Sequence, residues 1–109
     1  MVLVTCDLFK PSLTIINNSS HDIDRIEWIV NGEEYWFGDD SVWDSTLSKY
    51  EVGIAINSSS TRDVEAGSSY IYFNFADDAQ RYRTSEKVAI EARHDATFTF
   101  DDSTTVVPY

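Results

Sequence analysis

Carboxylates are the most abundant side chains in this sequence that could do chemistry, since nineteen Asp and Glu residues stand against eight Lys and Arg. Asp39, Asp40 and Asp44 lie close together in one polar stretch, residues 39–48. Carboxylates can bind Ca²⁺, but that ion needs roughly six to eight oxygen ligands, and no EF-hand spacing is present. We expect no cofactor and no metal site, although Ca²⁺ is the ion that such acids could attract. The other acidic pairs read as solvated turns: Asp77 with Asp78, and Asp101 with Asp102.

Catalytic motifs are missing from the chain. His21 and His94 are the two histidines, each in a polar turn and outside any metal-binding spacing. There is no nucleophile elbow and no glycine-rich phosphate loop. A hydrolase with paired carboxylates needs two acids roughly 5–10 Å apart, and among nineteen acidic residues no pair stands out. We expect no catalytic residue and no enzyme; the alternative is a small hydrolase, or an enzyme-associated accessory domain, with an acidic site.

The charge limits which partners the chain can bind. A formal net charge of -11 repels nucleic-acid phosphates and anionic membrane surfaces. Exposed aromatic side chains are typical of contacts with proteins and carbohydrates, and a nearby acidic loop would favour a basic partner. The sequence therefore predicts ligand contacts through Trp36 and Trp43, together with Asp39, Asp40 and Asp44. It leaves open whether the ligand is a protein or a glycan, and it leaves open the oligomeric state.

The element best defined by the sequence is a β-hairpin around Asn31-Gly32. Residues 23–30 and 33–37 read as strands, and Asn-Gly is the preferred pair for a two-residue type I′ turn. This turn fixes the pairs as Val30 with Glu33, Ile29 with Glu34, Trp28 with Tyr35, Glu27 with Trp36 and Ile26 with Phe37. The register places Ile26, Trp28, Tyr35 and Phe37 on one apolar face, with Glu27, Glu34 and Trp36 on the other.

The rest of the chain reads as short strands joined by polar turns, at residues 12–17, 50–57, 61–65, 70–75, 86–91, 96–100 and 104–107. This spacing predicts an all-β, antiparallel β-sandwich of about 7–8 strands. Residues 70–75 are apolar on both faces, which predicts a central strand. We expect residues 39–48 to form a long loop, with a helix over residues 40–49 as the alternative. The expected core is Ile15, Ile26, Trp28, Val52, Ile54, Phe73, Phe98 and Phe100.

With these elements in place, residues 12–107 resemble small immunoglobulin-like or transthyretin-like sandwich modules of bacterial envelope proteins. The resemblance rests on an opening strand SLTIINNSS, a mid-chain VEAGSSYIYF and a closing VAIEARHDATFTF, which would form a hairpin. It implies a non-enzymatic module of the cell envelope. Such a module would bind a protein or glycan of the envelope, or would act as a structural spacer.

The first eleven residues stand apart from this domain. Leu3-Val4-Thr5-Cys6 resembles a bacterial lipobox, in which the cysteine becomes lipidated, although Thr5 replaces the usual Gly, Ala or Ser. Cys6 is the single cysteine, so it has no intrachain disulfide partner. We expect residues 1–11 to be an apolar leader and tether, and residues 12–109 to be one domain. Contact with a membrane would then be made only through the lipid on Cys6.

Lipidation of Cys6 can be tested directly. We expect the full-length precursor, expressed in bacteria, to incorporate radiolabelled fatty acid, because the lipobox-like stretch presents one thiol ahead of a compact domain. The Cys6→Ser variant should lose the label completely. Equal labelling of both proteins, or no labelling of the precursor, would refute the anchor.

Overall fold

The computed structural model describes residues 10–109, so Cys6 and the lipobox-like stretch lie outside the described residues. The described chain contains twelve strands, and none of its residues forms a helix that could cross a membrane. The strands are β1 (Ser12–Asn18), β2 (Ile23–Val30), β3 (Glu33–Phe37), β4 (Asp40–Asp44), β5 (Lys49–Ile54), β6 (Ser59–Asp63), β7 (Gly67–Ser69), β8 (Ile71–Phe75), β9 (Arg81–Thr84), β10 (Val88–Ile90), β11 (Ala96–Asp101) and β12 (Val106–Pro108).

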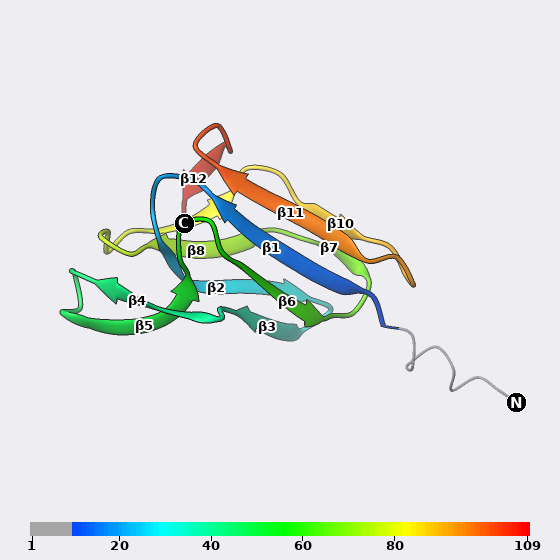
Figure 1. Ribbon diagram of the computed structural model, residues 1–109. Helices are drawn as coiled ribbons and strands as arrows, with labels where there is room; N and C mark the ends of the chain where they lie inside the picture. Colours follow the sequence, from blue (N-terminus) through cyan, green and yellow to red (C-terminus); the bar gives the residue numbers. More distant parts are fainter. Residues whose placement is uncertain (1–9) are drawn as a thin grey trace, which may run out of the picture.

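Two layers of strands enclose the core. One sheet has the order β11-β1-β6; the larger has the order β12-β9-β8-β2-β5-β4, with β3 also paired to β2. In Figure 1 the ribbon of the smaller sheet lies across β2 and β8. Side chains from both layers share one apolar cluster, among them Leu13 of β1, Phe100 of β11 and Phe73 of β8. The fold is therefore an all-β sandwich, as expected, with β7 and β10 forming a separate two-stranded sheet.

The Asn31-Gly32 hairpin is confirmed in full. All five pairs between β2 and β3 have the expected register, from Val30 with Glu33 to Ile26 with Phe37. Both turn residues have positive φ, 53° at Asn31 and 81° at Gly32, as a type I′ turn requires. The apolar face is buried, with Trp28 fully enclosed and its indole N–H donating to the carbonyl of Ser69 at 3.2 Å.

Most of the expected core is buried, with two exceptions. Ile15, Ile26, Trp28, Ile54, Phe73 and Phe100 each have 4% exposure or less. Phe98 is only half-buried at the margin of the cluster. Val52 was expected inside and that prediction is wrong, since the side chain is 65% exposed. Val52 does share a face with Ile54. At Val52, however, β5 has extended beyond the smaller sheet that covers this face.

Several expected elements differ from the structure. Residues 39–48 were expected to form a loop, with a helix as the alternative, but β4 and a turn occupy them. The prediction of a closing hairpin is also wrong, because β10 pairs with β7 and β11 pairs with β1. The pair of β1 and β11 is parallel, so the sandwich is not wholly antiparallel. Strand β9 was missed. The central position of residues 70–75 is confirmed, because β8 lies between β9 and β2.

A bulge in β2 determines how the β4–β5 hairpin joins the larger sheet. The register between β2 and β8 shifts between Asp24 and Glu27, and Arg25 has a left-handed φ of 48°. As a result β2 pairs with β5 at Ile23 and Asp24, and with β3 from Ile26 onward, along the same edge. Gly53 allows this close approach, because a Cβ there would lie 2.2 Å from the carbonyl oxygen of Ile23.

The difference between Phe73 and Val52 gives a test of the core. The Phe73 ring contacts those of Phe75, Tyr82 and Phe100, with centroids 5.0–6.1 Å apart. We expect Phe73→Ala to lower the free energy of unfolding by about 3–5 kcal/mol. Val52→Ala should cost less than about 1 kcal/mol, because this side chain is largely solvated. Urea denaturation measures the free energy of unfolding of both variants. Equal losses would mean that Val52 is buried and that the faces of β5 are misassigned.

Candidate functional site

One face of the β4–β5 hairpin is apolar and open to solvent. Trp43 pairs with Tyr50, and Ser41 with Val52, so these four side chains share a face, which we call the hairpin face. The rings of Trp43 and Tyr50 meet edge to face with centroids 5.3 Å apart. Their exposures are 48% and 67%, against 65% for Val52. Pairing of the rings holds them in place while leaving their surfaces available for contact.

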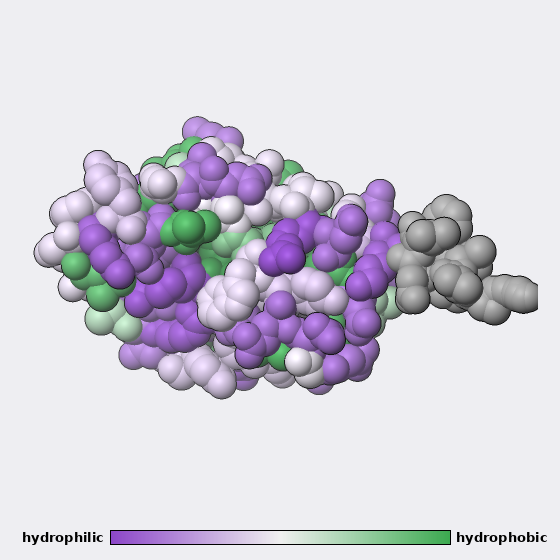
Figure 2. All heavy atoms as spheres, turned by 90° about the horizontal axis from the view of Figure 1, so that it is seen from below, coloured by the Kyte–Doolittle hydropathy of each residue, from purple (hydrophilic) through white to green (hydrophobic). Residues whose placement is uncertain are grey.

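The hairpin face is the uncovered continuation of the core. Ile54 lies on the same side of β5 as Val52, yet it is fully buried beside Ile23. The hairpin projects past the smaller sheet (Figure 1). Seen from below, the side on which β3, β4 and β5 lie, the surface is mostly hydrophilic with small hydrophobic groups, some at the end where this hairpin projects (Figure 2). Five of the seven large exposed hydrophobic side chains of the described chain fall within residues 43–56: Trp43, Leu47, Tyr50, Val52 and Ile56.

The sequence-predicted contact residues do not form one patch. Trp36 is 48% exposed but pairs with Glu27, on the outer face of the larger sheet, opposite to the hairpin face. Asp39 is exposed, next to the hydroxyl of Ser60 at 3.4 Å. Asp40 accepts a hydrogen bond from the backbone N–H of Ala55 at 3.1 Å. Thus Trp43 belongs to the hairpin face, while Trp36 belongs to a different surface.

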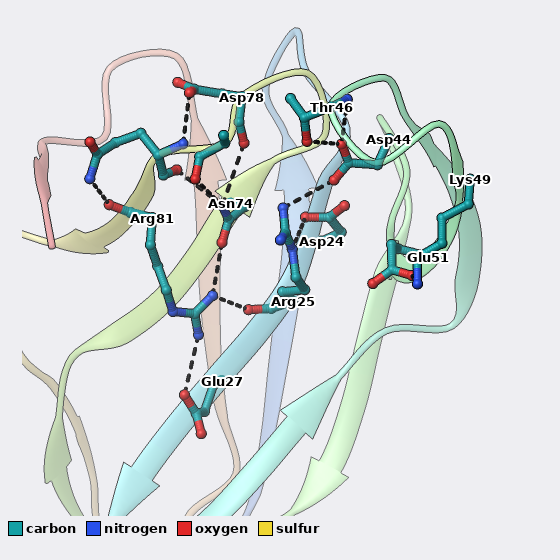
Figure 3. Close-up of polar contacts among 12 residues, drawn as sticks. Asp24, Arg25, Glu27, Asp44, Thr46, Lys49, Glu51, Asn74, Asp78 and Arg81 are labelled. Carbon is teal, nitrogen blue, oxygen red and sulfur yellow. Dashed lines mark hydrogen bonds and ion pairs between the residues drawn. The ribbon is translucent and has the colours of Figure 1, made fainter.

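Asp44, the fifth of these residues, is fully buried in a cluster that the sequence did not predict. It lies against Asp24 of β2, and both carboxylates have zero exposure. Arg25 bridges them, with Nη2 3.0 Å from Oδ2 of Asp44 and Nε 3.3 Å from Oδ1 of Asp24. Thr46 donates to Oδ1 of Asp44 from its backbone N–H at 2.9 Å and from its hydroxyl. We call Asp24 and Asp44 the acid pair (Figure 3).

The surroundings of the acid pair favour one proton shared between its two carboxyl groups. Oδ2 of Asp24 is the one buried side-chain polar atom of residues 10–109 that lacks a hydrogen-bond partner. A proton on this oxygen would allow it to donate a hydrogen bond. Burial, followed by the hydrogen bond with Asp44, raises the pKa of Asp24 to about 7, although Arg25 opposes this. Burial works against ionisation of Asp44, but hydrogen bonds from Asp24 and Thr46 and the charge of Arg25 prevail and lower its pKa. Of the two acids, Asp24 therefore favours the protonated form and Asp44 favours the carboxylate.

A second polar network continues from the bulge across the larger sheet. Arg81 of β9 donates to the carbonyl of Arg25 and to Oδ1 of Asn74, both at 2.9 Å, and pairs with Glu27 at 3.2 Å. Asn74 in turn donates to carbonyls of the β8–β9 turn, including that of Gln80 at 3.1 Å. Figure 3 shows both networks meeting at Arg25. These contacts fix the bulge from the β9 side, so that Arg25 remains over the acid pair.

A signal for the acid pair did exist in the sequence. The buried apolar residues of β2 are Ile23, Ile26, Trp28 and Val30. A regular strand repeats every second residue, so the single interval of three between Ile23 and Ile26 marks a bulge. The Asp24-Arg25 dipeptide occupies that interval. Its contact with Asp44 depends on the path of the β4–β5 hairpin, which no local pattern reveals.

The other polar surfaces of the described chain are shallow. Two shallow hollows of about 340 and 350 Å³ adjoin at His21 and Phe75. His21 packs edge to face on Phe75, with centroids 5.4 Å apart. The acids that line the hollows already accept hydrogen bonds, such as that from the Tyr82 hydroxyl to Asp78 at 2.9 Å. Within residues 10–109, no three His, Cys, Asp or Glu side chains are grouped so as to hold a metal ion.

Comparison with known proteins adds no further constraint. No protein-family model matches the chain, and neither the curated proteins nor the solved structures include a significant match.

The acid pair predicts how stability depends on pH. An Asp24 with a raised pKa keeps its proton when folded but loses it above about pH 4 when unfolded, so its contribution to stability falls as pH rises from about 4 to 7. At about 1.4 kcal/mol for each pKa unit, the loss is on the order of 2–4 kcal/mol. Asp24→Asn cannot titrate, and its amide still donates to Asp44. We expect this variant to lack that loss in urea unfolding between pH 4.5 and 8; parallel profiles would disprove the shared proton.

Proposed function

We propose that this protein is a non-enzymatic binding module of the bacterial cell envelope, anchored through lipid on Cys6. Its hairpin face would hold a partner protein. The observation that carries the binding role is the concentration of exposed apolar side chains on one hairpin, at Trp43, Tyr50 and Val52. Exposed aromatic anchors beside a sheet edge are typical of protein contacts. The envelope location rests on the sequence resemblance and on the lipobox-like stretch.

The partner that fits is an extended segment that alternates apolar and basic side chains. Strand β4 ends the strand order of the larger sheet, so one edge has no strand partner among the described residues. An extended peptide can pair with such an edge through backbone hydrogen bonds. Its apolar side chains would cover Trp43 and Val52, while its basic side chains would meet the negative field of a chain with net charge -11. A second copy carries the same charge, which disfavours self-association on this face.

The acid pair argues against the alternative, a small hydrolase with an acidic site. Asp24 and Asp44 are the buried carboxylates closest to a catalytic arrangement, but neither side chain has any solvent exposure. The Arg25 side chain, itself 31% exposed, pairs with both of them. A hydrolytic acid and base must touch the substrate and a water molecule. The pair therefore supports a structural role better than a catalytic one.

Glycan binding is the second candidate, and a different surface favours it. On the outer face of the larger sheet, Glu27 lies between Trp36 on β3 and Tyr72 on β8. Two inter-strand spacings separate these rings by roughly 10 Å. Tyr72 also stacks edge to face with Tyr109, with centroids 4.7 Å apart. Aromatic rings on a flat polar face can stack against sugars, and such binding would depend little on salt.

The two candidates predict opposite effects of two matched variants. We expect a synthetic peptide of alternating lysine and valine to bind and to shift the NMR signals of β4 and β5. Trp43→Ser should weaken this binding by roughly 10–100-fold, the loss typical of a central aromatic anchor. Trp36→Ser, at an equally exposed tryptophan, should leave it unchanged. Binding should also weaken as salt rises, because exposed charges are screened.

Soluble peptidoglycan fragments serve as the competing probe. Binding of these fragments that is lost in Trp36→Ser, retained in Trp43→Ser and insensitive to salt would replace the protein-binding proposal with the glycan one. If the lysine–valine peptide shifts no hairpin signal, the hairpin face is not a docking surface.

A further inference from the structure

We infer that the acid pair is a proton-operated latch that holds the β4–β5 hairpin against β2, so that loss of the shared proton frees the hairpin. The latch itself is a property of the free protein. Its effect on partner binding rests on the proposed function, because only then is the hairpin face a docking surface. The argument proceeds from how the hairpin is attached, through the charges around Asp24, to what ionisation would do.

The hairpin is attached to the rest of the sheet mainly at its base. Strands β4 and β5 share five backbone pairs, from Asp40 with Gly53 to Asp44 with Lys49. Strand β5 shares only two pairs with β2, at Ile23 and Asp24. Beyond that base, the far end of the hairpin is held by Arg25 on Asp44 and by the hydroxyl of Ser45, which donates to Asp77 at 3.0 Å. The contact between Asp24 and Asp44 therefore joins β2 directly to β4, a strand with which β2 has no backbone pairing.

The surroundings of Asp24 offer one cation for two acids. Arg25, from β2 itself, already pairs with Asp44 of β4. On the neighbouring strand β8, the residue opposite Asp24 is Asn74, which carries no charge.

The other two cations drawn around the pair in Figure 3 are engaged elsewhere. Arg81 of β9 pairs with Glu27 of β2 at 3.2 Å. Lys49 pairs with Glu51, both on β5, at 3.4 Å and is 62% exposed. Gly53, which is the residue of β5 opposite Asp24, contributes no charge. A second negative charge on the acid pair would therefore lack a cation of its own.

The charge balance decides the response to pH. With one proton, the acid pair and Arg25 carry one negative and one positive charge and are neutral together. Without it, two adjacent carboxylates face one guanidinium, and both have zero exposure to water. Repulsion and lost hydration then disfavour the closed arrangement. Moving the hairpin away from β2 would hydrate both acids. It would break the contacts of Arg25 and Ser45 and the two backbone pairs between β5 and β2, and a two-stranded hairpin left on its own is only marginally stable.

Opening of the latch would weaken docking at the hairpin face. A freed hairpin has to be ordered again when a partner binds, and that ordering reduces affinity. The module would thus hold its partner best in mildly acidic surroundings and release it as the pH rises above neutral. Salt and pH act on different groups here, because the acid pair is buried while the charges that attract a basic partner are exposed.

Amide hydrogen exchange on the free protein tests the latch without any partner. We expect the protection factors of β4 and β5, corrected for intrinsic exchange, to fall by up to tenfold per pH unit above about pH 7, as the loss of one proton allows. Protection of β1 and β8 should stay constant. Asp24→Asn should remove the pH dependence in the hairpin. Glu51→Gln, which removes one charge from the same hairpin outside the acid pair, should keep it.

Two outcomes would overturn the latch. One is an Asp24→Asn hairpin that retains the wild-type pH dependence, and the other is a loss of protection that is uniform over all strands. Should Asp24→Asn not fold, carboxyl ¹³C titration of the wild-type protein decides: titration of Asp24 near neutral pH supports the shared proton, and titration below pH 5 excludes it.

Binding of the lysine–valine peptide at pH 6 and pH 8.5 is then measured separately. Weaker binding at pH 8.5 in the wild type, but not in Asp24→Asn, supports control of docking by the latch. A pH-dependent hairpin whose peptide affinity does not change leaves the latch standing and removes its role in docking, whereas absence of peptide binding at both values removes the proposed function.

Discussion

Strand β2 pairs with three other strands, and the bulge between Asp24 and Glu27 bends it between two of them. Along one edge it pairs with β8; along the other it pairs first with β5 and then with β3. A bulge bends the strand that contains it, so β5 and β3 leave this shared edge in different directions. The left-handed Arg25 provides that bend, and Arg81 holds its carbonyl from the opposite side. The position of the β4–β5 hairpin, the exposure of its apolar face and the burial of the acid pair all follow from this bend.

The sequence predicted the fold best where the evidence was local. Asn31-Gly32 specifies its turn chemically, so the register of β2 and β3 followed from two residues and an alternation of faces. Strand β4 escaped detection because its burial is inverted: Asp44 is buried and Trp43 is exposed, the reverse of what hydropathy predicts for each. The alternation of β5 was recognised, and Val52 and Ile54 do share a face. Alternation cannot tell, however, where the covering sheet ends along that face.

The candidate site shows the same division between local and distant information. Trp43 was predicted as an exposed contact residue, and it is exposed. Asp44 was predicted as part of the same acidic loop but is buried, because its partner Asp24 lies on another strand. Asp24 was not singled out, since one acid in an apolar strand reads as a solvent-facing position. Pairing between distant strands, here through the path of a hairpin, is the information that a single sequence lacks.

The parallel pair of β1 and β11 has a consequence for the order of folding. Strand β1 is the first strand of the described chain, yet one of its two neighbours is β11, and the contact between Ser12 and Asp95 at the start of this pair spans 83 residues. During synthesis β1 can pair with β6 early, but its other edge stays unpaired until β11 has emerged. Contacts this distant slow folding and prolong the exposure of an unpaired edge. A chain cut short before residue 96 would keep that edge open, and its first strand would be the segment most prone to aggregate.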